Sequence, residues 1–377
     1  MPRIKPPSEQ IKPVSTQHSE RPSQAMVAQR AGVSTATVSL ALNSHPRIPA
    51  ATRQRVLAVA QEIGYQQDMA MHPRRATSQR VNRTPGTRVL AFLWNSDQGC
   101  MMESSFHRTL FAGASDAACR LSQNLLLIQS RTENLAEAAA ACGADGYVLA
   151  SPDTATLDAA RRTGRPMVAF TASEVSCTRI CFDQTLAVQM AFQSLYAQGH
   201  RKIGFLGLES GSSRAYLLKT AYLNCLHAAG IPVDERLIGR FPDSLHRDRG
   251  MRAMRQLWVN QRGRPTAVLA CDDHAALGAI RALGELGIDV PRTVSVIGID
   301  GLPEGEHSTP RLTTVATGIT GMGARAVEVL EEAVRTRHCE PQSIIMPIAL
   351  QWRQSVAMPP RELQHAVTED FAATPSI

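Results

Sequence analysis

Residues 27–43 read VAQRAGVSTATVSLALN, and this stretch decides the fold of the N-terminal part of the chain. Apolar residues at helical spacing lie on both sides of Gly32, which can adopt the left-handed backbone of a tight turn. Ser23 and Ser34 stand just before the two apolar runs, where a serine hydroxyl can cap a helix. The stretch therefore predicts two short helices joined by a tight turn.

A third helix is predicted at about 49–64. Pro49 fits its first turn, because the N–H that proline lacks would have no partner there. Gly64 is a suitable stop signal. The apolar stripe of this helix consists of Val56, Leu57, Ala60 and Ile63. Residues 23–65 are thus expected to form a small all-α domain with a helix-turn-helix.

The positive charge of the chain is concentrated at its N-terminal end. Residues 1–85 contain 12 Lys and Arg against 4 Asp and Glu, a net charge of +8, whereas the whole chain carries +7. Residues 86–377 therefore sum to −1, from 28 basic and 29 acidic residues. A basic head on a near-neutral body indicates that the head binds a polyanion such as DNA. A solvated basic tail would give the same pattern, so charge alone leaves both interpretations open.

Polar segments flank the predicted domains. Residues 1–22 are rich in Pro, Ser, Gln and Lys and are expected to be disordered. Residues 66–86 form a basic linker with two prolines, and residues 359–377 form a C-terminal tail. No apolar stretch is long enough to span a bilayer, and the N-terminus lacks the apolar segment of a secretory signal. A cytoplasmic location without membrane contact is therefore expected.

The eight cysteines are scattered without a CxxC pair. In a chain without an export signal they are expected to be reduced thiols, mostly buried. Cys177 and Cys181 are four residues apart, but no neighbouring cluster of histidines or carboxylates completes a metal site. The sequence therefore predicts neither a metal nor another cofactor.

From residue 88 onward, short apolar runs alternate with amphipathic helices. Strands are predicted at 89–93, 125–128, 147–150, 167–170, 203–206, 267–269 and 294–299, and helices at 184–198, 215–229 and 273–286 among others. Such alternation favours parallel sheets covered by helices on both faces. The units are too many for one small sheet, so residues 87–358 are expected to form two lobes. The first would contain about 87–195 and 317–342, and the second about 196–316 and 343–358.

Residues 23–65 resemble the DNA-binding head of the LacI-type repressors. The resemblance is carried by VAQRAGVSTATVSLALN, quoted above, and by PRIPAATRQRVLAVAQEIGY at 46–65. The matching stretches of the body are ADGYVLASP at 144–152, GHRKIGFLG at 199–207, CDDHAALGAIRALGELGIDVPRTVSVIGID at 271–300 and PRLTTV at 310–315. The resemblance implies an all-α head followed by an α/β body of two Rossmann-like lobes, similar to a periplasmic sugar-binding protein. It also implies a homodimeric regulator, expected to be a repressor, that binds a pseudo-palindromic operator in double-stranded DNA and a small-molecule effector.

The second helix of such a head carries the residues that reach base edges in the major groove. Its N-terminal residues here are Ser34, Thr35 and Ala36. Further DNA contacts are expected from hydroxyls and amides that bind phosphates and from basic side chains, namely Ser34, Thr37, Ser39, Asn43, Arg53 and Arg55. Leu40 stands where many family members carry Arg, so base readout should rely on methyl and hydroxyl contacts. A three-helix bundle that binds a protein is the alternative interpretation.

The linker departs from the family pattern. Family members usually have a short hinge helix here, whose Leu enters the minor groove. Pro73 lies inside the matching run 68–75 and would disrupt such a helix. Met69 and Met71 are candidates for the apolar wedge. Alternatively, the linker only spans the gap and adds arginines to the contacts with the DNA backbone.

The effector site is predicted from position. In open α/β sheets, ligands bind beyond the carboxyl ends of the strands. Asp273 follows a predicted strand, and the resemblance makes it a ligand hydroxyl acceptor, although a helix N-cap would suit this residue equally well. Asp183 and Phe241 match other family ligand positions, although Phe241 suits the core at least as well. Leu218 occupies the place of the usual effector-binding Arg, which argues against a typical sugar or purine.

Two other functions fit parts of the sequence. An enzyme with a Rossmann cofactor would need a G-x-G-x-x-G after a strand, and the chain has none, nor a paired acid and base. A binding protein for transport would need an export signal and no basic head. The sequence therefore predicts a regulator without catalytic residues.

Overall fold

The computed structural model describes residues 23–42, 48–63, 87–170, 177–209, 213–241, 248–259 and 264–360. The chain forms two compact units, Met1–Val81 and Asn82–Ile377, called the head and the body below. Predictions for Asn43, Gly64, the linker with Pro73, the first 22 residues and the tail beyond 360 lie outside the described residues.

The head contains α1 (Gln24–Ala31), α2 (Thr35–Leu42) and α3 (Ala50–Glu62). Ser23 caps α1, where its hydroxyl oxygen accepts a hydrogen bond from the Met26 N–H at 3.4 Å. Gly32 ends α1 with φ of +64°, a conformation that costs glycine little. Pro49 lies at the N-cap of α3, one position before the predicted one, because its backbone is already extended. The core of the head consists of Val27, Ala28, Ala31, Val38, Ala41, Val56 and Ala60.

The first lobe of the body is a parallel six-stranded sheet in the order β11-β5-β4-β3-β1-β2. Its strands are β1 (Val89–Asn95), β2 (Asn124–Ser130), β3 (Gly146–Ala150), β4 (Met167–Phe170), β5 (Thr178–Phe182) and β11 (Ser343–Met346). Its helices are α4 (Ser105–Arg120), α5 (Thr132–Ala141), α6 (Thr154–Arg162) and α12 (Ile319–Thr336), with the short turns η1 (Ser96–Gln98) and η2 (Met101–Glu103). Every residue of β1 and β3 is buried, as expected for strands covered on both faces.

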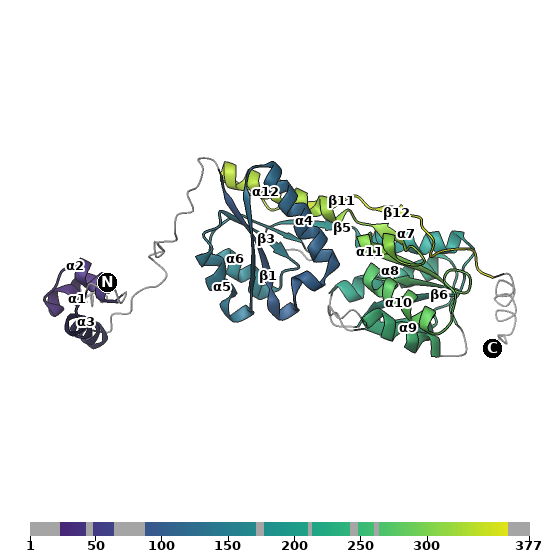
Figure 1. The fold of residues 1–377 in the computed structure, drawn as a ribbon, viewed down its shortest axis with the longest axis horizontal. Coiled ribbons are helices and arrows are strands. Elements are labelled where there is room, and N and C mark those ends of the chain that lie inside the picture. Colours follow the sequence, from purple (N-terminus) through teal and green to yellow (C-terminus); the bar gives the residue numbers. More distant parts are fainter. Residues whose placement is uncertain are drawn as a thin grey trace, which may run out of the picture. The chain divides into compact units, whose positions relative to one another are not determined.

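The second lobe is a six-stranded sheet in the order β12-β10-β9-β8-β6-β7, in which only β12 is antiparallel to its neighbour. Its strands are β6 (Ile203–Leu208), β7 (Ile238–Phe241), β8 (Ala267–Ala270), β9 (Ser295–Asp300), β10 (Thr313–Ala316) and β12 (Ala349–Gln351). Its helices are α7 (Gln184–Ala197), α8 (Ser213–Ala228), α9 (Arg249–Val259), α10 (Asp273–Glu285) and α11 (Pro303–His307), with the short turn η3 (Glu235–Leu237). Helices α7 and α8 pack together, as do α9 and α10 (Figure 1). The two-lobed parallel architecture predicted from the alternating pattern is confirmed.

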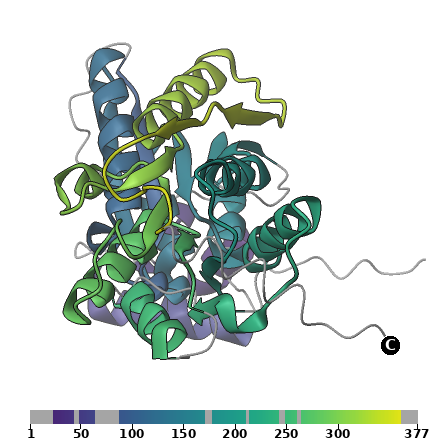
Figure 2. The same ribbon diagram turned by 90° about the vertical axis from the view of Figure 1, so that its right-hand side faces the viewer.

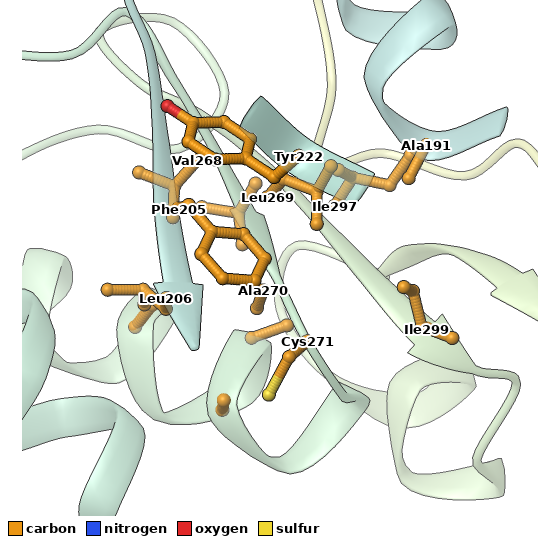
Figure 3. Packing of buried hydrophobic residues seen from close by; sticks show 14 of the residues in the cluster. Ala191, Phe205, Leu206, Tyr222, Val268, Leu269, Ala270, Cys271, Ile297 and Ile299 are labelled. Carbon is orange, nitrogen blue, oxygen red and sulfur yellow. The ribbon is translucent and has the colours of Figure 1, made fainter. Parts of the chain in front are cut away.

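The core of the second lobe is built from the sheet and from the helices that cover it. The Phe205 ring of β6 lies against the Tyr222 ring of α8, with ring centroids 4.9 Å apart and planes inclined by 14° (Figure 3). The Tyr222 hydroxyl donates a hydrogen bond to the carbonyl of Ile203, so this buried polar group has a partner. Leu269 and Ile297 come from the neighbouring strands β8 and β9 and are fully buried.

The chain crosses between the lobes at β5–α7, at β10–α12 and at β11–β12 within the described residues. The lobe boundaries predicted from the sequence need two corrections. Helix α7 belongs to the second lobe, because Ala187, Val188 and Ala191 are buried in its core. Strand β11 belongs to the first lobe, because it pairs with β5. Apolar periodicity identifies such elements but cannot tell which of two sheets buries them.

Helices α4 and α12 of the first lobe run side by side (Figure 2). A β-carbon at Gly323 would lie 2.0 Å from the Leu110 carbonyl oxygen, and one at Gly113 would lie 2.0 Å from the Thr320 carbonyl oxygen. These two glycines therefore allow the two backbones to touch. Within the described ranges, no helix is both long and apolar enough to cross a membrane.

Candidate functional site

The recognition face of the head is the N-terminal end of α2. Ser34 caps this helix, and its hydroxyl oxygen accepts a hydrogen bond from the Thr37 N–H at 3.1 Å. The Ser34 and Thr37 hydroxyls are also 2.9 Å apart. Thr35 and Ala36 are exposed, while Val38 on the opposite side of the helix is fully buried. The cap and the core thus hold the first turn of α2 with two small side chains facing outward.

The other predicted DNA contacts of the head have different surroundings. Arg55 is exposed on α3, and Ser39 is half-buried on α2. Arg53 is half-buried and donates a hydrogen bond to the Ile48 carbonyl at 3.5 Å. Part of its guanidinium is therefore bound within the head. The exposed Arg30 forms an ion pair with Glu62 at 3.8 Å, which joins α1 to α3.

Asp273 has a different environment from the one predicted. It is fully buried, and one carboxylate oxygen accepts hydrogen bonds from the backbone N–H groups of Gly301 at 2.9 Å and Leu302 at 2.7 Å. Its other oxygen accepts one from the Thr314 hydroxyl at 2.6 Å. Burial raises the pKa of Asp273 to about 6, although these hydrogen bonds oppose the rise. Its contacts within the second lobe and the turn after β9 give Asp273 a structural role, and its predicted role in ligand binding stays untested.

Asp272 takes the capping role that the sequence offered to Asp273. Its carboxylate accepts a hydrogen bond from the Ala275 N–H at 2.8 Å and one from the Arg249 guanidinium at 2.6 Å. Burial opposes the ionisation of Asp272, but the charges of Arg249 and Arg214 outweigh burial and lower its pKa. The alternative role of N-cap thus belongs to the neighbouring residue, because two adjacent aspartates after a strand give the same sequence signal.

Phe241 and Asp183 also have roles within the fold. Phe241 is buried in the core of the second lobe, and the Arg249 guanidinium lies 5.1 Å from the centre of its ring. Phe241 thus supports the arginine that pairs with Asp272. Asp183 is exposed and caps α7, where it accepts a hydrogen bond from the Leu186 N–H at 2.9 Å. No contact of either residue tests its predicted role in ligand binding.

Leu218 is buried in the core of the second lobe. This position of α8 therefore offers no cation to a ligand. Arg214 precedes it by one turn on α8 and therefore lies on the same face of that helix. Its charge acts on Asp272 and, in the first lobe, on His107. Arg214, which the sequence places near Leu218 but not in its motif position, thus brings a guanidinium to this face of α8 one helical turn earlier.

His107 of the first lobe interacts electrostatically with Arg214 and His274 of the second lobe. This side chain is buried on α4, and its ring nitrogens lie 2.8 Å from the Ser104 hydroxyl and 3.0 Å from the Ser151 hydroxyl. Burial, assisted by the positive charges of His274 and Arg214, lowers the pKa of His107 to about 4. His274 follows directly after Asp273 on α10, so the two histidines come from different lobes and interact electrostatically.

These residues form one polar cluster from both lobes, called the interlobe cluster below: His107, Arg214, Arg249, Asp272 and His274. It lies where parallel strands end and helices begin, the usual position for ligands in such sheets. It offers hydrogen-bond donors, a buried carboxylate and two guanidinium groups. Sequence reasoning missed most of it, because His107, Arg214 and Arg249 are single residues at the starts of α4, α8 and α9, and only Asp272 and His274 share a motif.

Two sequence families match this chain. Residues 26–68 match the family described as bacterial regulatory proteins, lacI family. Residues 192–356 match the periplasmic binding protein-like domain. The first match covers most of the head helices, and the second covers most of the second lobe together with α12 and β11 of the first.

Relatives match over most of the chain. The transcriptional repressor PurR of Escherichia coli O1:K1 is 30% identical over 351 residues, which are 88% of this chain and 96% of that protein. Catabolite control protein A of Priestia megaterium is 25% identical over 87% of this chain and 97% of that protein. The transcriptional regulator CelR of Thermobifida fusca is 28% identical over 89% of this chain and 98% of that protein.

Solved structures show the same architecture. A complex of the regulator CelR with cellobiose has a TM-score of 0.63 and 25% identity, and covers 89% of this chain and all of that chain. The lac repressor dimer bound to operator has a TM-score of 0.62 and 22% identity, and covers 88% of this chain and 98% of that one. The match of the head, the two-lobed body and the 30% sequence identity to PurR point to the same family. The chain belongs to the LacI family of bacterial regulatory proteins.

Proposed function

We propose that this chain is a homodimeric repressor that reads its operator with the first turn of α2. The observation that supports this most is the exposure of Thr35 and Ala36 directly after the Ser34 cap. A helix enters the major groove with its N-terminal end toward the base edges, where these side chains offer a methyl and a hydroxyl. Ser39, Asn43, Arg53 and Arg55 supply contacts with the DNA backbone in this proposal.

A dimer fits this mode of binding. The exposed end of α2 is a single short turn, so one head makes few base contacts. Two heads on one dimer bind two half-sites, and the second binding event gains from a high effective concentration. The half-sites should be related by two-fold symmetry and centred about one helical turn of DNA apart.

The body of this repressor binds a small molecule at the interlobe cluster. Because the cluster contains polar side chains from both lobes, a ligand there would favour one arrangement of the lobes over another. A ligand can change operator affinity only through such a difference in binding between two states. The relative CelR has been solved with cellobiose, but Arg214, Arg249 and Asp272 give the cluster here a more charged composition than a neutral sugar requires.

Selection of bound fragments from random DNA tests the head. The full chain should enrich a pseudo-palindromic sequence, and replacing Thr35 and Ala36 together should change the preferred bases. Arg55→Gln is the matched control on α3, and should weaken all sequences alike with a smaller salt dependence. Enrichment of no sequence, or equal DNA binding after removal of residues 1–65, would show that the head is not a DNA reader.

Thermal unfolding with defined compounds tests the body. We would compare cellobiose and ribose with dicarboxylic acids and sugar phosphates. A compound that binds the cluster should raise the melting temperature of the wild type but not of Asp272→Asn, which keeps an N-cap and loses the charge that faces Arg249. Asp289→Asn, an exposed acid at another site in the second lobe, should respond like the wild type. Equal responses in all three proteins would place the ligand elsewhere.

A further inference from the structure

The turn after β9 connects the second lobe to the core of the first. This turn, residues 300–304, is called the interlobe plug below. Leu302 is fully buried and packs in the hydrophobic cluster of the first lobe, which includes Phe92 of β1 and Ile319 of α12. A residue that follows a strand of one lobe thus completes the core of the other.

Asp273 holds the plug from the second lobe. Its carboxylate accepts the N–H groups of Gly301 and Leu302, the two residues that lead into the first lobe. Space for this carboxylate comes from Gly298, where a β-carbon would lie 2.2 Å from the Asp273 Oδ1 atom. Gly301 has φ of +79° and passes so close to Ala316 that a β-carbon would lie 2.6 Å from the Ala316 side chain. Gly298 in β9 thus leaves room for the Asp273 carboxylate, and Gly301 allows the turn that this carboxylate holds.

The plug also contacts α4 of the first lobe and the crossing segment between β10 and α12. Glu304 forms an ion pair with Arg108 of α4 at 2.8 Å and a hydrogen bond with Ser105. Thr317, in the crossing between β10 and α12, donates its N–H to the Asp300 carbonyl at 3.0 Å. Helix α4 also carries His107 of the interlobe cluster. The plug is therefore joined to the helix and to the crossing segment that a change in lobe arrangement would involve.

We propose that Asp273 is a positioning residue that couples the interlobe cluster to the first lobe by holding the plug with Leu302 seated in that lobe's core. The residue before Asp273 is Asp272, which pairs with Arg249 in the cluster, so one helix end joins the ligand site to the plug. Movement of this helix end changes the hydrogen bonds from Asp273 to the N–H groups of Gly301 and Leu302. The packing of Leu302 in the first lobe, next to α4, then changes as well. This proposal rests on the proposed ligand-controlled DNA binding, but the plug can be tested without a ligand.

Hydrogen exchange on the full chain without DNA is the first test. Asp273→Asn should raise amide exchange both in residues 300–307 and in the first turns of α4, because the link between them loosens. Leu302→Ala should do the same. The control is Leu269→Ala, which also truncates a fully buried leucine, but in the core of the second lobe. Faster exchange confined to the second lobe in Asp273→Asn and Leu302→Ala would refute the coupling.

Operator affinity is the second test, with the DNA duplex selected by the wild type as the probe. Asp273→Asn and Leu302→Ala should change affinity in the same direction, by between about twofold and thirtyfold. Leu269→Ala should leave the affinity of the folded fraction unchanged. Equal effects of all three variants would mean a general loss of stability and would overturn the proposal. If the wild type selected no DNA, the proposed function would fail, while the exchange experiment would still decide whether the plug joins the lobes.

Discussion

The head and the body of this protein place their functional residues in opposite ways. The recognition face of the head comes from one continuous segment, Ser34–Thr37, held by a cap within that segment and by a small core. The interlobe cluster of the body comes from the starts of four helices, which contribute one or two residues each between positions 107 and 274. The head therefore depends on local interactions, whereas the body depends on close packing between distant segments. Changes to packing should thus damage the body most, and changes to caps should damage the head.

The largest expected effect is at the contact between α4 and α12. Gly323→Ala would push a methyl group into the Leu110 carbonyl and should lower the free energy of unfolding of the body by about 3 kcal/mol or more. Gly284→Ala is the matched helical control, because no atom lies within 4 Å of a β-carbon there. That variant should be neutral or slightly stabilising. Denaturant unfolding of both variants checks the difference, and similar losses would mean that the two helices do not pack closely.

Acid should weaken the body through its buried histidines. His200 is 1% exposed and bonded to Thr266 and Ser295, and burial lowers its pKa to about 4. The unfolded chain, with a histidine pKa of about 6.5, binds the proton more readily, so stability is lost as the pH falls below that value. The loss from this residue should reach about 2 kcal/mol at pH 5.

The pH experiment compares the wild type with His200→Asn between pH 7 and pH 5. The variant should start less stable and show a shallower decline. His338→Asn removes an exposed histidine and should follow the wild type. Residues 23–42 and 48–63 of the head contain no histidine, so the protection of their amides, corrected for the pH dependence of intrinsic exchange, should change little over the same range. An unchanged slope in His200→Asn would contradict the assigned pKa.

A smaller effect is expected at the cap of the recognition helix. Ser34→Ala removes the acceptor for the Thr37 N–H and should destabilise α2 by about 1 kcal/mol. Amide exchange in residues 35–42 should increase, while the unfolding of the body stays the same. Ser34→Asp keeps an N-cap acceptor and should preserve the protection of α2. Equal exchange in the wild type and Ser34→Ala would show that the tight turn alone holds this helix.

The smallest effect is expected from the ion pair between α1 and α3. Arg30 and Glu62 are 57% and 71% exposed, so water screens their attraction. A double-mutant cycle with Arg30→Gln and Glu62→Gln should give a coupling below about 0.5 kcal/mol. A coupling above about 1 kcal/mol would mean that charge, rather than the small apolar core, sets the stability of the head.

The sequence by itself determined the local features of the protein. Ser23, Gly32 and Ser34 identified the helix ends of the head, because caps and turns depend on the residues nearest to them. The alternating apolar runs predicted two lobes with parallel sheets, because strands covered on both faces are apolar throughout. The charge difference and the helix-turn-helix motif predicted a DNA-binding regulator, which agrees with the family.

Only the tertiary structure decided which distant residues meet. It assigned the N-cap to Asp272 and the plug to Asp273, although the two adjacent residues are chemically identical. It placed α7 in the second lobe and Leu302 in the core of the first. A local pattern shows that a residue will be buried or will cap a helix, but not which partner it receives. That partner is set by packing across segments far apart in the chain, and single residues carry no local signal of it.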